Sequence, residues 1–105
     1  MPPMRLTMWA DDPGLIALDG AEMVLSPMQY RLLVSLAHHA PKTRTYAQLS
    51  EAMRDPHDPE GPGTAQIHWQ AHRLRLLGLP ILTRPRYGYA LAMHLRRSPG
   101  QPGRT

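Results

Sequence analysis

The chain has 105 residues, 42% of them hydrophobic, and contains no cysteine. This length predicts one small domain whose core can form without disulfides or metals. The absence of cysteine excludes disulfide frameworks, thiolate zinc sites and cysteine nucleophiles. No segment reaches the roughly 18 apolar residues of a membrane span, and the first residues lack the order of a signal peptide, so we expect a cytoplasmic protein.

The charge is distributed unevenly along the chain. Residues 1–62 hold five basic and eight acidic residues, whereas residues 63–105 hold seven arginines and no Asp or Glu. A basic segment of one sign is typical of a surface that binds nucleic acid, because Arg neutralises phosphates and releases their counterions. A solvated basic face without a partner is the alternative interpretation.

The first 25 residues predict a small antiparallel sheet. Short apolar runs at 4–9, 15–18 and 21–25 alternate with turn residues. Asp19 and Gly20 stand between the second and third runs, and an Asp-Gly pair in this setting is a strong indication of a hairpin. We therefore expect three N-terminal strands.

A capping box predicts the start of the first helix. Ser26 can cap it, Pro27 suits its first position and Gln29 stands at its third. Pro41 blocks extension, because the residue before a proline avoids the helical conformation. The first helix is therefore expected over 27–39.

The same box recurs at Thr45 and Gln48 and predicts a second helix over 46–53. Residues 42–44 are expected to form a short strand before it. The segment 54–63 that follows contains three prolines and two glycines, which exclude regular structure. We expect an acidic loop there.

A third helix is expected over 64–77. No helix breaker interrupts this segment, and Ile67, Ala71 and Leu74 recur at helical spacing. Gly78 follows as a suitable terminator. Placing Ile67 at the centre of the buried side puts Trp69, His72, Arg73 and Leu76 on the opposite side.

The helix is followed by a predicted hairpin. Strands at 81–84 and 88–93 flank the turn Pro85-Arg86-Tyr87, with Gly88 expected to supply a left-handed conformation. The domain is expected to span 4–95, between a flexible N-terminus at 1–3 and a disordered basic tail at 96–105. The order of elements predicts an α+β fold, a winged helix-turn-helix with N-terminal antiparallel strands, three helices and a C-terminal hairpin wing.

Three motifs resemble the OmpR/PhoB-type DNA-binding domain of bacterial response regulators over residues 15–93. Each marks the beginning or end of a helix in that family. They are Leu25-Ser26-Pro27 with Leu32-Leu33, Thr45 to Leu49, and Arg73-Leu74-Arg75 followed by Ile81-Leu82-Thr83 and Gly88-Tyr89.

The resemblance implies a bacterial or phage protein that binds double-stranded DNA sequence-specifically and regulates transcription. Helix 64–77 would enter the major groove, wing 81–92 the minor groove, and the start of helix 46–53 would contact the backbone. The family's receiver domain has no room here, so a stand-alone effector domain is expected. It would be monomeric in solution and could pair on DNA.

The candidate DNA-binding residues share this predicted surface. Gln pairs bidentately with adenine and Arg with guanine, and apolar edges contact thymine methyl groups. The family carries Arg-Gly where this chain has Pro85-Arg86, so the arginine that contacts the minor groove would be Arg84 or Arg86. The residues are Tyr46, Thr64, Gln66, Trp69, Gln70, His72, Arg73, Arg84 and Arg86.

Other interpretations remain open. Trp69 and Leu76 are large and apolar for a DNA-facing side, which favours packing against the wing, with a partner protein as the alternative. The fold could instead act on RNA polymerase, a sigma factor or another regulator, or have an architectural role that bends DNA. Loop 54–63 could contact RNA polymerase or be a plain connector.

No enzyme activity, cofactor or metal is expected. His68 and His72 have the four-residue spacing of a zinc-protease pair, but Trp69 stands where the catalytic Glu would follow the first His. No phosphate-binding glycine loop or nucleophile elbow is present.

Overall fold

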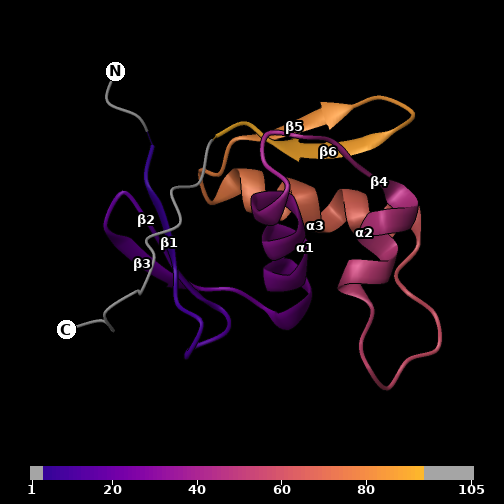
Figure 1. Ribbon diagram of the computed structural model, residues 1–105, viewed down its shortest axis with the longest axis horizontal. Helices are drawn as coiled ribbons and strands as arrows, with labels where there is room; N and C mark the ends of the chain where they lie inside the picture. The colour runs from indigo at the N-terminus through magenta and orange to yellow at the C-terminus, as the bar shows by residue number, and fades with distance from the viewer. Residues whose placement is uncertain (1–3, 94–105) are drawn as a thin grey trace.

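An N-terminal sheet and a second, smaller sheet frame three helices in the computed structural model, which describes residues 4–93 (Figure 1). The first sheet has the order β1-β2-β3 and is antiparallel. Its strands are β1 (Leu6–Met8), β2 (Leu15–Leu18) and β3 (Ala21–Val24). The three expected strands are confirmed, although the first is shorter than the apolar run 4–9.

The β2–β3 turn has the conformation that its sequence predicts. Asp19 and Gly20 both have positive φ, 52° and 86°, which matches the right-handed twist of a two-residue hairpin. The Oδ1 atom of Asp19 accepts a hydrogen bond of 2.8 Å from the backbone N–H of Arg5. This contact ties the start of the chain to the turn.

Two capping boxes begin α1 (Pro27–His38) and α2 (Tyr46–Met53), as the sequence predicts. The Ser26 hydroxyl accepts from the N–H of Gln29, whose side-chain oxygen accepts from the N–H of Ser26. Thr45 and Gln48 repeat this exchange at α2. Each box satisfies two backbone donors that a helix start leaves unpaired.

The third helix, α3 (Thr64–Leu76), ends in a Schellman motif. Gly78 has φ 101°, its N–H donates to the carbonyl of Arg75, and the N–H of Leu79 donates to that of Leu74. Leu74 and Leu79 are both buried, so the motif also closes an apolar contact. Gly78 terminates the helix as predicted.

The second sheet has the order β4-β6-β5. It consists of β4 (Arg44–Thr45), β5 (Ile81–Arg84) and β6 (Gly88–Leu91). The expectation of a strand at 42–44 is wrong by one or two residues, because the N–H of Lys42 donates to the carbonyl of His39 in a turn. The strand predicted over 88–93 ends at Leu91.

The predicted role of Gly88 in the hairpin turn is only partly met. Gly88 has a positive φ of 158°, but the residue in the left-handed helical conformation is Arg86, with φ 72°. Gly88 is also needed for a close approach, since a Cβ there would lie 1.8 Å from the carbonyl oxygen of Arg44. Only glycine lets β4 pair with β6 at this point.

One core joins the helices to both sheets. Its fully buried members include Ile16 from the first sheet and Leu91 from the second, with Leu32, Leu33, Leu36, Leu49, Met53, Ile67 and Leu74 from the helices. The chain is thus a compact α+β structure with three helices and two small antiparallel sheets over the described residues. No helix in residues 4–93 is long and apolar enough to cross a membrane. The expectations for 1–3, for 96–105 and for the boundary at 95 lie outside the described residues.

Candidate nucleic-acid interface

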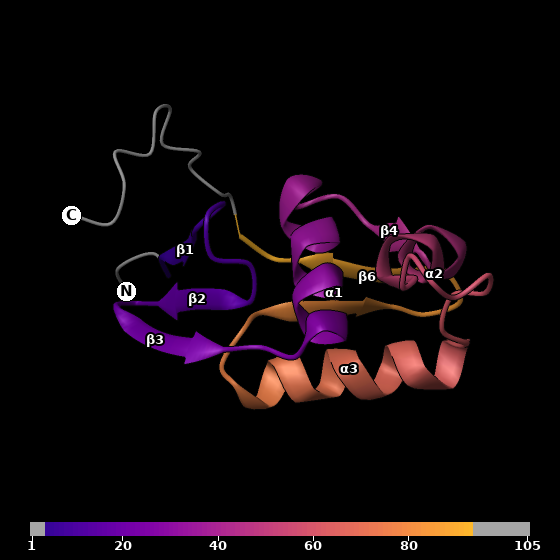
Figure 2. The ribbon, with the colours of Figure 1, turned by 90° about the horizontal axis from the view of Figure 1, so that it is seen from below.

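The outward side of α3 is open to solvent. Figure 2 shows α3 at the edge of the molecule, with α1 and the β5–β6 hairpin on one side of it only. Thr64, Gln66, His72 and Arg73 are exposed, and Trp69 is 53% exposed. Five of the predicted site residues therefore share one accessible surface.

Trp69 organises the middle of that surface. The guanidinium carbon of Arg73 lies 5.7 Å from the centroid of its ring, within the range of a cation–π contact. The ring of His72 lies 6.2 Å away, between centroids. These three side chains form one exposed patch, in which the rings of Trp69 and His72 are inclined to each other by 39°.

The expected packing of Trp69 and Leu76 against the hairpin is wrong. Leu76 is 68% exposed, and the ring contacts of Trp69 come from residues of its own helix. The side chain that fills the space between hairpin and helix is Tyr89 of β6, which is 3% exposed. Trp69 and Leu76 lie on the outward side of α3 and remain exposed there.

The prediction that Gln70 lies on the DNA-facing surface is wrong as well. Its side chain is 8% exposed, and Nε2 donates to the sulfur of Met28 on α1 at 3.7 Å. Gln70 follows Ile67 by three residues and therefore belongs to the buried side of the helix. Gln66 donates to the same sulfur at 3.4 Å but remains exposed.

Tyr46 belongs to an aromatic cluster beneath the hairpin. Its ring centroid lies 5.3 Å from that of His68 and 6.1 Å from that of Tyr89, in edge-to-face arrangements. The Tyr89 hydroxyl is hydrogen-bonded to Nδ1 of His68. Tyr46 is half-buried at the first position of α2, so its ring joins the start of α2 to α3 and β6.

The phenol of Tyr89 keeps its proton over a wider pH range than usual. Desolvation by burial raises its pKa, the neighbouring Tyr46 raises it further, and the positive charge of Arg75 opposes both. The neutral hydroxyl thus remains available to hydrogen-bond with His68.

Arg75 fastens the hairpin to α3, a role that sequence reasoning missed. Its Nε donates to the carbonyl of Ile81 at 2.8 Å, and Nη2 donates to the hydroxyl of Thr83. Its guanidinium carbon also lies 5.7 Å from the ring centroid of Tyr89. The alternation of Arg73 and Arg75 around Leu74 indicates that the two arginines point apart, but not which one meets the hairpin.

The hairpin tip carries two exposed arginines. Arg84 and Arg86 flank Pro85, and neither side chain forms an ion pair or hydrogen bond with residues 4–93. The N–H of Tyr87 donates to the carbonyl of Arg84 at 3.0 Å and closes the turn. Both guanidinium groups are therefore available to bind anions.

Loop 54–63 is held by its own polar groups. Asp55 and Asp58 accept hydrogen bonds from the backbone N–H groups of His57 and Glu60. The Ser50 hydroxyl of α2 donates to the carbonyl of Pro62 at 2.8 Å. The loop extends from α2 away from the hairpin (Figure 1).

The two histidines of α3 have different neighbours. His68 contacts Tyr46 and Tyr89, whereas His72 contacts Trp69. Within residues 4–93, no group of three or more His, Asp or Glu side chains is placed to hold a metal ion.

Comparison with models of known protein families and with curated protein sequences found no match. The functional argument therefore rests on the surface formed by α3 and the tip of the hairpin.

Proposed function

We propose that this chain is a winged helix protein that binds double-stranded DNA sequence-specifically and regulates transcription. In this proposal α3 enters the major groove and the β5–β6 hairpin, the wing, reaches the adjacent minor groove. The observation that carries it is the set of exposed donors on one helix and one hairpin tip, in a segment without Asp or Glu. Such a segment attracts the phosphate backbone without acidic repulsion.

The dimensions of α3 suit the proposed position. Its 13 residues correspond to about 20 Å, and a major groove about 12 Å wide admits an α-helix. Gln66 and Arg73 supply side chains that can pair with adenine and guanine. Trp69 supplies an apolar edge for a thymine methyl group.

The start of α3 suits a phosphate. Gly63 caps the helix without a side-chain hydrogen bond, and the first turn contains no acidic residue. The N–H groups of this turn and the Thr64 hydroxyl can therefore donate to a DNA phosphate. This contact would set the depth of α3 in the groove.

Selection from a pool of random duplexes at two salt concentrations tests the proposal. We expect an enriched motif and binding that weakens steeply with salt. Replacing Arg73 by Ala should weaken binding, whereas replacing Arg5 by Ala, which removes the same charge from the N-terminal sheet, should change it little. Failure to bind any duplex at low salt would contradict the proposal, and binding without a motif would favour an architectural role.

A second candidate is a protein-interaction module that acts on RNA polymerase, a sigma factor or another regulator. The exposure of Trp69 and Leu76 on α3 favours it, because protein interfaces use such side chains as anchors. Acidic loop 54–63 would be a further polymerase contact. Partner binding that depends on Trp69 and survives loss of Arg73, Arg84 and Arg86 would support this function over DNA binding.

A further inference from the structure

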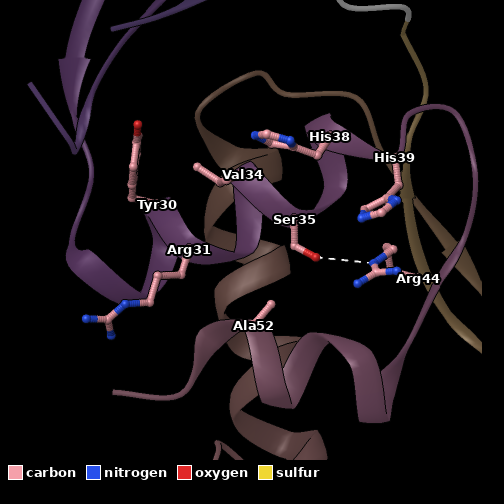
Figure 3. A pocket seen from close by; sticks show the side chains of 8 residues that line it. All are labelled: Tyr30, Arg31, Val34, Ser35, His38, His39, Arg44 and Ala52. Atoms are coloured by element: carbon pink, nitrogen blue, oxygen red, sulfur yellow. Dashed lines mark hydrogen bonds between the residues drawn. The ribbon is translucent and has the colours of Figure 1, made fainter. Parts of the chain in front are cut away.

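A groove between α1 and α2 lies on the far side of the molecule from the outward surface of α3. Figure 3 looks into it, with α3 behind the two helices. Its volume is about 370 Å³, and Val34, Ala52 and the ring of Tyr30 provide most of its apolar wall. The groove is open to solvent, so a segment of a partner can enter it.

The groove carries positive charge without negative charge. This charge comes from Arg31 on α1 and Arg44 on β4, and His38 and His39 at the end of α1 also line the groove. No Asp or Glu is among its lining residues. The groove is thus complementary to a ligand with carboxylates on either side of an apolar group.

Arg44 is held in place to receive such a ligand. Its Nε donates to the hydroxyl of Ser35 at 3.3 Å, which fixes the guanidinium at the wall of the groove. Both Nη groups lack a hydrogen-bond partner among residues 4–93. They can bind a carboxylate through a charge-assisted pair.

The pKa of His39 lies below its ordinary value in this environment. Its pKa is lowered by desolvation and then by the positive charges of Arg44, His38 and Lys42. A carboxylate bound beside it would act in the opposite direction. The imidazole therefore provides a measurable response to an anionic occupant.

We propose that this groove binds an acidic segment of a partner protein, with carboxylates at Arg31 and Arg44 and an apolar side chain against Val34 and Ala52. The site faces away from α3, so binding there leaves the outward side of α3 free. The chain's own acidic loop is a poor occupant, since Asp55 and Asp58 accept hydrogen bonds from their own backbone. This inference goes beyond the proposed function and does not depend on it.

The proposal is tested by selecting, from a displayed library of short random peptides, those that bind the full chain in the absence of DNA. We expect enrichment of peptides that combine Asp or Glu with Leu, Ile or Phe. Charge reversal by Arg31→Glu and filling of the groove by Ala52→Gln should each weaken their binding roughly tenfold or more. The matched control Arg5→Glu reverses the same charge outside the groove and should have little effect.

Nuclear magnetic resonance of the same complexes supplies a second readout. An enriched peptide should perturb Val34 and Ala52 and raise the pKa of His39 in the native sequence. The circular dichroism spectra of both variants should match that of the native chain, because both positions lie on helix surfaces.

Three results would overturn the proposal. The first is no enrichment of acidic peptides, or peptides whose binding neither groove variant changes. The second is a response of the groove to inorganic phosphate alone and to no peptide. The third is self-association of the chain that both variants abolish, since the occupant would then be a second copy.

Discussion

Arg73 and Arg75 lie two residues apart on α3, and each guanidinium carbon is 5.7 Å from the centroid of an aromatic ring. Arg73 lies over the exposed Trp69, on the outward side of the helix. Arg75 lies over the buried Tyr89 and donates to Ile81 and Thr83 of the hairpin. The same residue type is thus open to a ligand on one side and fastens the fold on the other.

This comparison limits what net charge indicates about function. Within residues 63–93 there are four arginines and no acidic residue, yet one of the four, Arg75, is hydrogen-bonded to the hairpin. The surface that is open to bind anions is therefore smaller than the count of charges suggests. Arg73, Arg84 and Arg86 remain as candidate phosphate or base contacts.

The largest expected effect comes from removing all three open arginines. Under the proposed function, replacing Arg73, Arg84 and Arg86 by Ala should reduce DNA affinity on the order of 100-fold or more, since each substitution would remove a charge-assisted hydrogen bond to DNA. The slope of log affinity against log salt should fall by about 0.9 for each phosphate that the protein no longer neutralises. Fluorescence anisotropy with a labelled duplex from the selection measures both quantities. An unchanged affinity would place the binding surface elsewhere.

Arg75→Ala should affect the fold more than Arg73→Ala does. It removes two hydrogen bonds to the hairpin and a cation–π contact, and we expect the free energy of unfolding to fall by about 2–3 kcal/mol. Arg73→Ala is the matched control, and we expect a change within about 0.5 kcal/mol. Urea denaturation distinguishes them. Equal losses of unfolding free energy would contradict the assignment of Arg75 to the fold and of Arg73 to the open surface.

Gln66 and Gln70 sharpen the same comparison with a neutral residue. Gln70→Ala should lower the free energy of unfolding by about 1–2 kcal/mol, because its side chain is buried against Met28. The DNA motif should stay the same. Gln66→Ala should leave the stability nearly unchanged and relax the preference at one base pair, by about 1–3 kcal/mol if the amide contacts adenine. Denaturation of both variants measures the loss of stability, and repeating the duplex selection with both variants measures the change in base preference.

The smallest expected effect concerns alkaline pH. Folding raises the pKa of Tyr89, so the folded state holds the phenol proton more tightly than the unfolded state does. In the unfolded state the phenol has a pKa of about 10. Its stabilising contribution is present below that pH and decreases as the pH rises through the folded pKa. Denaturation midpoints of the native chain and of Tyr89→Phe should therefore converge at high pH. If the two midpoints differed by the same amount at every pH, the hydroxyl would stabilise the fold through its packing, and its ionisation would have no effect.

The sequence was most informative where structure is local. The Ser26–Gln29 and Thr45–Gln48 boxes place the beginnings of α1 and α2, because each capping exchange involves only residues three apart. The Asp19-Gly20 turn and the Gly78 terminus depend in the same way on backbone conformations that these residues adopt easily. The limits of the last strand were less accurate, because strand ends depend on pairing partners that are distant in sequence.

The candidate site was only partly accessible from the sequence. Helical periodicity correctly placed Ile67 inside and Trp69, His72 and Arg73 outside. Gln70 follows Ile67 by three residues and is buried, although it was predicted on the DNA-facing surface. A polar side chain can be buried when a neighbouring helix supplies a partner, and Met28 lies 42 residues away in the chain.

By itself the sequence determined the order of the elements, the helix starts and the basic character of the second half, since these follow from short-range spacing and composition. Only the tertiary structure decided which arginines stay open, that Tyr89 rather than Trp69 fills the space under the hairpin, and that Gly88 serves a close approach to Arg44. Each of these outcomes depends on contacts between segments far apart in the chain. Such contacts form after folding brings surfaces together, and local sequence carries no record of their geometry.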